Sequence, residues 1–213
     1  MIDFNGVLIF LKGAVLGFSI AAPVGPIGLL CINRTLSHGM RNGLVSGLGA
    51  ATADGFYGMV AAGGLTSLSS MLIRSQVLFR LFGGAFLLYL GAKTFLSRST
   101  PARNGENRPQ PGDFFRAYSS TFALTITNPV TIISFTAIFA GLGIGSSGGS
   151  MIGAMMMVAG VFCGSSAWWT ILSGVFGLLR SRVNHGFLLW INRVAGTVLF
   201  AFGIIALVSL MNN

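Results

Sequence analysis

The chain has 213 residues, of which 53% are hydrophobic and only 8% are charged, and its net charge is +9. Soluble proteins carry about 25% charged residues, whereas the 63 residues between Arg116 and Arg180 contain no charged side chain. This composition excludes a soluble domain, because so few charges cannot cover its surface. The basic residues stand in short segments between apolar runs, which is typical of membrane-protein loops and argues against nucleic-acid binding. The sequence therefore predicts an all-α membrane protein.

Six apolar runs are long enough to cross a bilayer, which takes about 20 mostly apolar residues per helix. The longest uncharged stretch divides at a Gly-rich segment, 141–150, and so supplies two spans. In chain order the expected spans are 13–33, 43–65, 77–96, 117–140, 151–178 and 187–210. Between the third and fourth spans, residues 98–116 contain three prolines and four arginines. We expect them to form a flexible linker between a first half, 1–97, and a second half, 117–213.

The arginines predict the orientation of the chain in the membrane. The first, third and fifth loops together contain eight arginines, the second loop and its edges contain two, and the fourth loop contains none. Loops rich in Lys and Arg remain in the cytoplasm. We therefore expect the odd-numbered loops, including the linker, to be cytoplasmic and both termini to be external.

The two halves repeat the same pattern of glycines and helix breakers. Three sets of positions match in order, at offsets of 103, 111 and 112 residues. They are Gly25-Pro26 with Asn128-Pro129, Gly49 and Asp54 with Gly160 and Ser165, and Gly84 and Gly91 with Gly196 and Gly203. Because each half has three spans, the second half would insert upside down, as in the inverted repeats of secondary transporters. We expect two inverted-topology three-helix repeats; the alternative is coincidence in a chain with 31 glycines.

Breakers within the first and fourth spans predict that both helices are interrupted. A proline removes a backbone donor and clashes with the carbonyl one turn back, and such breaks are tolerated in a bilayer where they face protein or a cavity. A half-helix that begins at Pro26 would direct free N–H groups and a positive dipole into the protein, which suits a carboxylate. The candidate substrate-binding residues are Gly25, Pro26, Ile27, Gly28, Thr125, Asn128, Pro129 and Thr131. A packing kink is the alternative at each break.

Asp54 is the acidic residue that falls inside an expected span. A charged group in the bilayer costs a few kcal/mol or more, so function is the default interpretation. A carboxyl in low-dielectric surroundings takes up a proton more readily than in water, which suits proton coupling. Pairing with a substrate ammonium is the second interpretation, and a structural ion pair with Arg34 or Arg41 is the third.

The segment Ala22-Pro-Val-Gly-Pro-Ile-Gly28, followed by Arg34-Thr-Leu, Gly39, Gly43, Gly47 and Asp54, resembles the LysE/RhtB family of bacterial amino-acid exporters. Asn128-Pro129 adds to the resemblance, which extends over the whole chain. It implies export of an amino acid or a close derivative across the inner membrane, in exchange for protons. The implied substrate contacts are at the two breaks, and the implied intramembrane acid is Asp54. The expected partners are the small-molecule substrate, protons and the lipid bilayer, with no cofactor and no metal.

Two other kinds of transporter stay open at this stage. A metal-cation exporter of the same superfamily would need several carboxylates or histidines in its spans. A thiol–disulfide electron carrier would need paired cysteines, but Cys31 and Cys163 are not related by the repeat offsets and form no CxxC. The chain contains no ATP-binding GxxxxGK[ST] loop, so an ion gradient is the expected energy source. The small-residue faces would serve internal packing or a homo-oligomer equally well.

Overall fold

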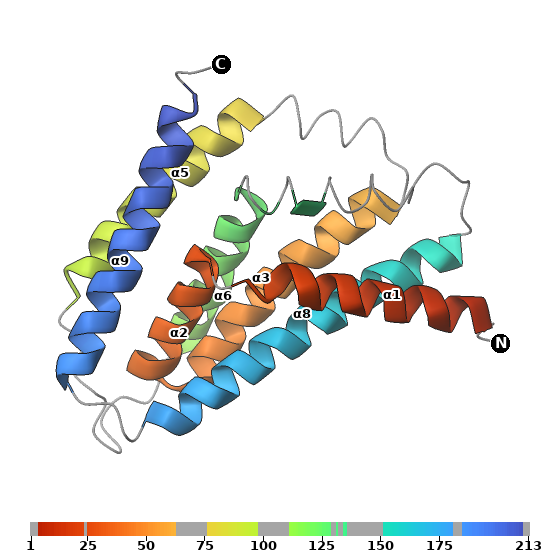
Figure 1. Cartoon of the computed structure of the whole chain (residues 1–213), viewed down its shortest axis with the longest axis horizontal. Helices are drawn as coiled ribbons and strands as arrows, with labels where there is room; N and C mark the ends of the chain where they lie inside the picture. Colours follow the sequence, from red (N-terminus) through yellow and green to blue (C-terminus); the bar gives the residue numbers. More distant parts are fainter. Residues whose placement is uncertain are drawn as a thin grey trace.

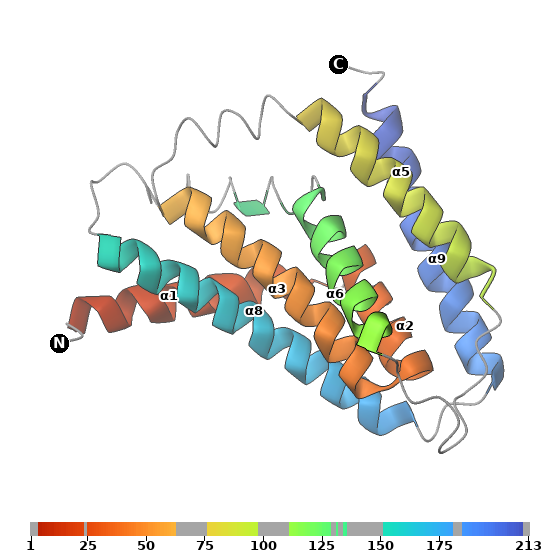
Figure 2. The same cartoon turned by 180° about the vertical axis from the view of Figure 1, so that it is seen from behind.

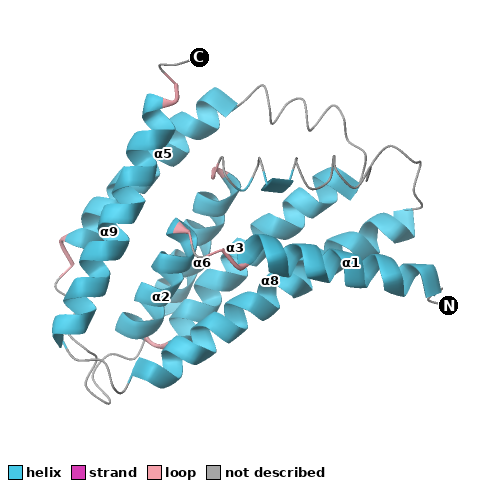
Figure 3. Ribbon diagram, viewed as in Figure 1, coloured by secondary structure: helices cyan, strands magenta, loops and turns pink. Residues whose placement is uncertain are grey.

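A computed structural model of the protein describes residues 4–23, 25–62, 76–97, 111–128, 131, 134–135, 151–180 and 185–210. All regular structure in these residues is helical, as predicted, and the other described residues form loops and turns (Figure 3). The helices are α1 (Phe4–Ala21), α2 (Pro26–His38), α3 (Met40–Ala62), α5 (Gln76–Phe95), α6 (Pro111–Ile126), α8 (Met151–Leu179) and α9 (His185–Val208) (Figure 1).

Four of the expected spans coincide with single helices. The bounds of α3, α5, α8 and α9 lie within three residues of the expected spans 43–65, 77–96, 151–178 and 187–210. The first expected span is divided into α1 and α2. The helix of the fourth begins earlier than expected, at Pro111, because a proline in the first turn and Asp113 beside it favour a helix start. Much of the remaining part of that span lies outside the described residues.

Two of the described helices are long and apolar enough by themselves to cross a membrane, Met151–Leu179 and Gly186–Val208. The bent pair of α1 and α2 makes a third if it counts as one span. α3 has 23 residues, or about 34 Å of helix, but its polar residues lower its hydropathy: they include Asn42, Ser46, Thr52 and Asp54. The described helices thus give two or three apolar spans, and the count of six stays a prediction.

The centre of the molecule is formed by α3 and α8, which lie side by side (Figures 1 and 2). α1 packs along the outer side of α8, and α6 packs along α3. α5 and α9 form a separate pair that contacts the rest through α2 and, less extensively, through α6. Large apolar side chains point outward from α1, α5, α8 and α9, among them Val15, Phe82 and Leu178, as expected of helices that face lipid.

Glycines allow the backbones of these helices to approach closely. A Cβ added to Gly17 of α1 would overlap the Val161 carbonyl of α8, and one added to Gly164 of α8 would overlap the Ala14 carbonyl of α1. This is the small-residue packing that replaces hydrophobic burial between helices in a membrane.

The α5–α9 pair has two matching close contacts. An ideal Cβ on Gly91 would lie 2.9 Å from the Gly196 carbonyl, and one on Gly203 would lie 2.9 Å from the Gly84 carbonyl. All four glycines belong to the repeated pattern of the sequence.

Candidate functional site

The first span bends by 80° between α1 and α2, at the position predicted from its prolines and glycines. Gly25 is the N-cap of α2 and has an extended backbone conformation. Because glycine has no side chain, no capping hydrogen bond is made to the first N–H groups of the helix. Pro26 has no N–H, so Ile27 and Gly28 supply the first free backbone donors of α2. A Cβ on Gly25 would meet none of the described heavy atoms within 4 Å. Among the described residues the space beside Gly25 is therefore open, while Pro26, Ile27 and Gly28 are buried.

The second predicted break follows the end of α6 at Ile126. Thr125, Asn128 and Thr131 are all at least nine-tenths buried. The hydroxyl of Tyr57 donates a hydrogen bond to the carbonyl of Ile126, which is one of the last α6 carbonyls and has no partner inside the helix. Pro129 lies outside the described residues, so its predicted contact with substrate stays a prediction.

Asp54 lies on α3 and faces α8. It is 3% exposed, and its Oδ2 accepts a hydrogen bond of 2.6 Å from the Ser165 hydroxyl. Ser165 in turn accepts a hydrogen bond of 3.0 Å from the indole N–H of Trp169. In the described part of the chain Asp54 has no cationic partner. The structural ion pair with Arg34 is therefore wrong, because that guanidinium bonds to other groups.

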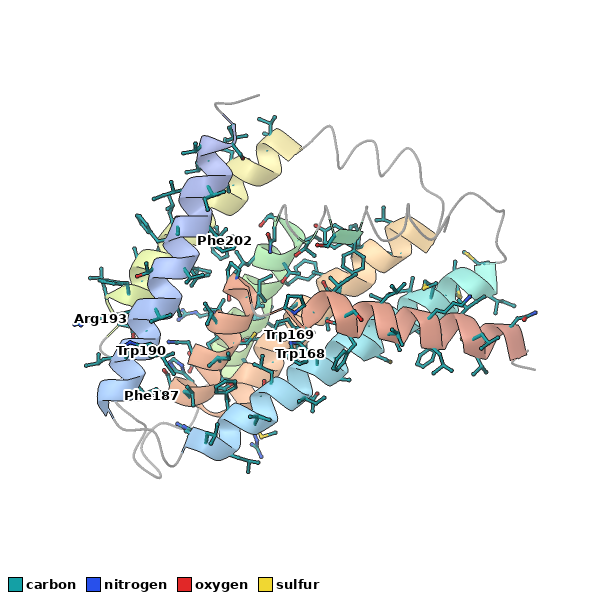
Figure 4. All side chains as sticks on the ribbon, in the orientation of Figure 1. Trp168, Trp169, Phe187, Trp190, Arg193 and Phe202 are labelled. Atoms are coloured by element: carbon teal, nitrogen blue, oxygen red, sulfur yellow. The ribbon has the colours of Figure 1, made fainter. Side chains whose placement is uncertain are left out.

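The two tryptophans of α8 lie near the centre of the molecule, where α1 ends (Figure 4). Trp169 is 4% exposed and lies against Gly47 of α3. The ring of Trp168 meets Phe18 of α1 edge to face, with centroids 5.5 Å apart. Trp169 is therefore part of the buried hydrogen-bonded chain rather than an anchor at the membrane surface. Figure 4 shows such outward aromatic residues on α9 instead, where Trp190 is 60% exposed.

Helix register brings Asp54 to the same height as the α2 start. The chain turns at Gly39, which has φ 97°, so α2 and α3 run antiparallel with Thr35 against Gly43. If the two helix axes stay aligned, Pro26 of α2 would come level with Thr52 of α3, nine residues or about 14 Å from this contact. Asp54 is the next residue but one in α3.

The end of α6 lies at this height as well. The Tyr118 hydroxyl of α6 donates to Thr52 at 2.9 Å, and Tyr57 of α3 reaches Ile126. Asp54 lies between these two contacts along α3. Along α3, Asp54 thus lies between two contacts with α6, and α3 also packs against α2, which begins at the first predicted break.

Sequence reasoning missed several polar residues that line the same helices. Arg34 donates to three hydroxyls and one carbonyl on α3 and α6, although the sequence placed it in the first loop, with an ion pair to Asp54 as the alternative. The side chains of Asn33 and Asn192 hydrogen-bond to each other, and Asn192 also donates to the Ser97 carbonyl at 3.1 Å. The repeat matches Ser165 with Asp54 at the 111-residue offset, but it did not predict that the two side chains hydrogen-bond to each other.

The two residue groups that the rival transporters would use are not assembled in the described residues. Cys31 is buried and Cys163 is exposed, and both are free thiols. The described residues contain no cluster of three or more His, Cys, Asp or Glu side chains that could hold a metal ion. The site described above consists of backbone N–H groups, hydroxyls, an amide and one carboxyl.

Comparison with known proteins identifies the family of the chain. The LysE type translocator family matches residues 18–210. The chain is 28% identical over 196 residues to "Putative amino acid efflux protein YcgF" of Bacillus subtilis (strain 168), covering 92% of this chain and 93% of that protein. It is 27% identical over 175 residues to "Uncharacterized membrane protein YahN" of Escherichia coli (strain K12), covering 81% and 77%. No solved structure gives a significant match. This chain belongs to the LysE type translocator family.

Proposed function

We propose that this protein exports an amino acid or a close derivative across the bacterial inner membrane, in exchange for protons. Membership of a translocator family supports a transporter rather than an enzyme. A relative named for amino acid efflux supports the substrate class. The observation that carries the proposal is the burial of Asp54 without a cationic partner in the described residues, on the helix that packs against α2.

The substrate carboxylate binds at the two helix breaks. The free N–H groups of Ile27 and Gly28 and the positive end of the α2 dipole favour an anion there. The open space beside Gly25 leaves room for it. On the other side of the site, Asn128 and Thr131 supply an amide and a hydroxyl from a second interrupted span.

Asp54 carries the proton that is exchanged for substrate. A carboxylate enclosed by helices is costly when charged, which favours its protonated form while the site is closed. When the site opens to water, the carboxyl is solvated and releases its proton. Ser165 donates to the carboxylate at 2.6 Å and can also accept from the protonated acid, so the same contact serves both states.

Alternating access is provided by two inverted three-helix repeats that rock around this site. The glycine contacts of α5 and α9 support the repeat. The 112-residue offset relates Gly91 to Gly203 and Gly84 to Gly196. Under this relation the contact of Gly91 with Gly196 is equivalent to the contact of Gly203 with Gly84. A two-fold relation between the helices produces this reciprocity.

The α3 and α8 helices support the same relation at the 111-residue offset. Gly49 of α3 faces the carbonyl of one α6 residue and the N–H of the residue four later, Tyr118 and Phe122. Gly160 of α8 likewise faces a carbonyl and the N–H of the residue four later on α1, those of Phe10 and Ala14, which precede the α6 pair by 108 residues rather than by the 103 that separate the two breaks. Asp54 and Ser165, which the same offset relates, bond directly to each other and so lie where the two repeats meet.

A counterflow screen in proteoliposomes tests the proposal. Vesicles are preloaded with one unlabelled amino acid, and uptake of the labelled compound is followed across a panel of amino acids, amines and divalent cations. Protein-free vesicles and vesicles without preload are the controls. We expect counterflow with at least one amino acid. Counterflow restricted to metal cations, or to no member of the amino-acid panel, would contradict the proposed function.

A further inference from the structure

Arg34 holds a positive charge inside the helix bundle without a carboxylate beside it. It is on α2, and its side chain points between α3 and α6 rather than toward water. One terminal nitrogen donates to Ser46 at 2.9 Å and to Thr121 at 2.7 Å. The other donates to Ser120 at 2.8 Å. In the described part of the chain no Asp or Glu pairs with it, so its charge is solvated but not neutralised.

The three hydroxyls around Arg34 are oriented to hold a cation. Each donates its own hydrogen to a carbonyl four residues earlier in its helix: Ser46 to Asn42, Thr121 to Ala117 and Ser120 to Arg116. Their oxygen lone pairs are therefore left for the guanidinium. These neutral acceptors fix the group in place while the positive potential remains.

One edge of the guanidinium is free to bind a ligand. The Nε–H of Arg34 makes no hydrogen bond to any residue that the structure describes, and the nitrogen that bonds Ser120 has a second hydrogen. Two parallel N–H groups along one edge match the two oxygens of a carboxylate. The side chain of Arg34 is only partly buried.

Arg34 lies on the same helix as the proposed carboxylate site. It follows Pro26 by eight residues, or about 12 Å along α2, toward the α2–α3 turn. We infer that Arg34 is a second docking position for the substrate carboxylate, on the path between the α2–α3 turn and the start of α2. A substrate released from one position would thus meet a second group that binds its carboxylate before it reaches bulk water. This inference rests on the proposed function, because it needs a substrate that bears a carboxylate.

The test compares an amino acid with its carboxamide, which keeps the side chain and ammonium but lacks the carboxylate. The labelled substrate is the amino acid that gives the largest counterflow. Its uptake is inhibited with either the unlabelled amino acid or the carboxamide, and an inhibition constant is measured for each. We expect Arg34→Gln to raise the inhibition constant of the amino acid about 10- to 100-fold, as loss of a charge-assisted hydrogen bond does. The inhibition constant of the amide should change less than about threefold. Arg41→Gln, at an exposed arginine of α3, is the matched control and should change neither.

A purely structural role for Arg34 predicts a different result. Loss of a clamp between helices would weaken binding of the acid and the amide equally, and that outcome would overturn the inference. If Arg34→Gln does not fold, Arg34→Lys retains the charge without the two-pronged edge. Thermal stabilisation of this purified variant by each compound should then show the same loss of preference for the acid. If the wild type moves no amino acid, the proposed function itself fails; if it does and the preference survives both variants, only the inference fails.

Discussion

Adding a methyl group to Gly49 or Gly160 should loosen the packing of α3 on α6 or of α8 on α1, the two contacts that the proposed repeat relates. A Cβ on either glycine would overlap a backbone carbonyl of the neighbouring helix, that of Tyr118 or that of Phe10. Backbone atoms cannot rotate away, so the helices must separate. Such overpacking costs about 1–3 kcal/mol.

The controls are glycines of the same helices with room for a methyl group. A Cβ on Gly55 of α3 would lie 3.5 Å from its nearest neighbour, and one on Gly174 of α8 would lie 3.9 Å away. Alanine also favours helix over glycine by up to about 1 kcal/mol, and this gain is common to all four variants. The difference between the tight and open positions is therefore about 1–3 kcal/mol. At about 2–4 °C per kcal/mol, the midpoints should differ by about 2–12 °C.

Thermal unfolding of the detergent-solubilised protein, followed by the loss of the monodisperse peak in size-exclusion chromatography, measures these midpoints. We expect Gly49→Ala and Gly160→Ala to melt below Gly55→Ala and Gly174→Ala, and by similar amounts. If the tight and open positions melt together, the close backbone packing is refuted. If only one of Gly49→Ala and Gly160→Ala lowers the unfolding midpoint, α3 and α8 are not equivalent in their packing.

Four further variants address the breaks and the topology. Pro26→Ala and Pro129→Ala should each reduce counterflow more than they reduce the amount of folded protein in the membrane, because they restore a backbone N–H and straighten the helix; normal transport at wild-type abundance by both would make the breaks packing kinks. A cysteine at Ser99 should resist an impermeant thiol reagent in intact cells, whereas one at Asn213 should react, since arginine-rich loops stay in the cytoplasm; external labelling at position 99 would reverse the orientation.

Most of the helices could be predicted because hydropathy records them directly. The bounds of α5, α8 and α9 follow from apolar runs that end at charged or breaking residues. α6 was placed six residues late, because its first turns contain charged residues and lie in a Pro-rich segment. A hydropathy pattern does not predict the start of this helix, because the start is determined by a proline and an acidic residue in its first turn.

The candidate site was predicted in part, and the missing part is tertiary. The bend at Gly25 and the burial of Asp54 follow from residue type, since proline breaks helices and an acid inside a span is enclosed. The partner of Asp54 depends on how α3 crosses α8, which the chain order alone does not reveal. Arg34 was misjudged for the same reason: its side chain reaches residues of α6 more than 80 positions away.

The central claim is that Asp54 carries the exchanged proton, and gradient-driven export by Asp54→Asn tests it most directly. Inside-out proteoliposomes are assayed for uptake with and without an imposed pH gradient, beside Asp113→Asn as a control at an exposed carboxyl of α6. We expect Asp54→Asn to lose uphill transport while exchange between equal substrate pools continues, because exchange needs alternating access but no net proton movement. Loss of both activities with a raised substrate constant would assign Asp54 to the ammonium group. Full gradient-driven transport by Asp54→Asn would contradict the account.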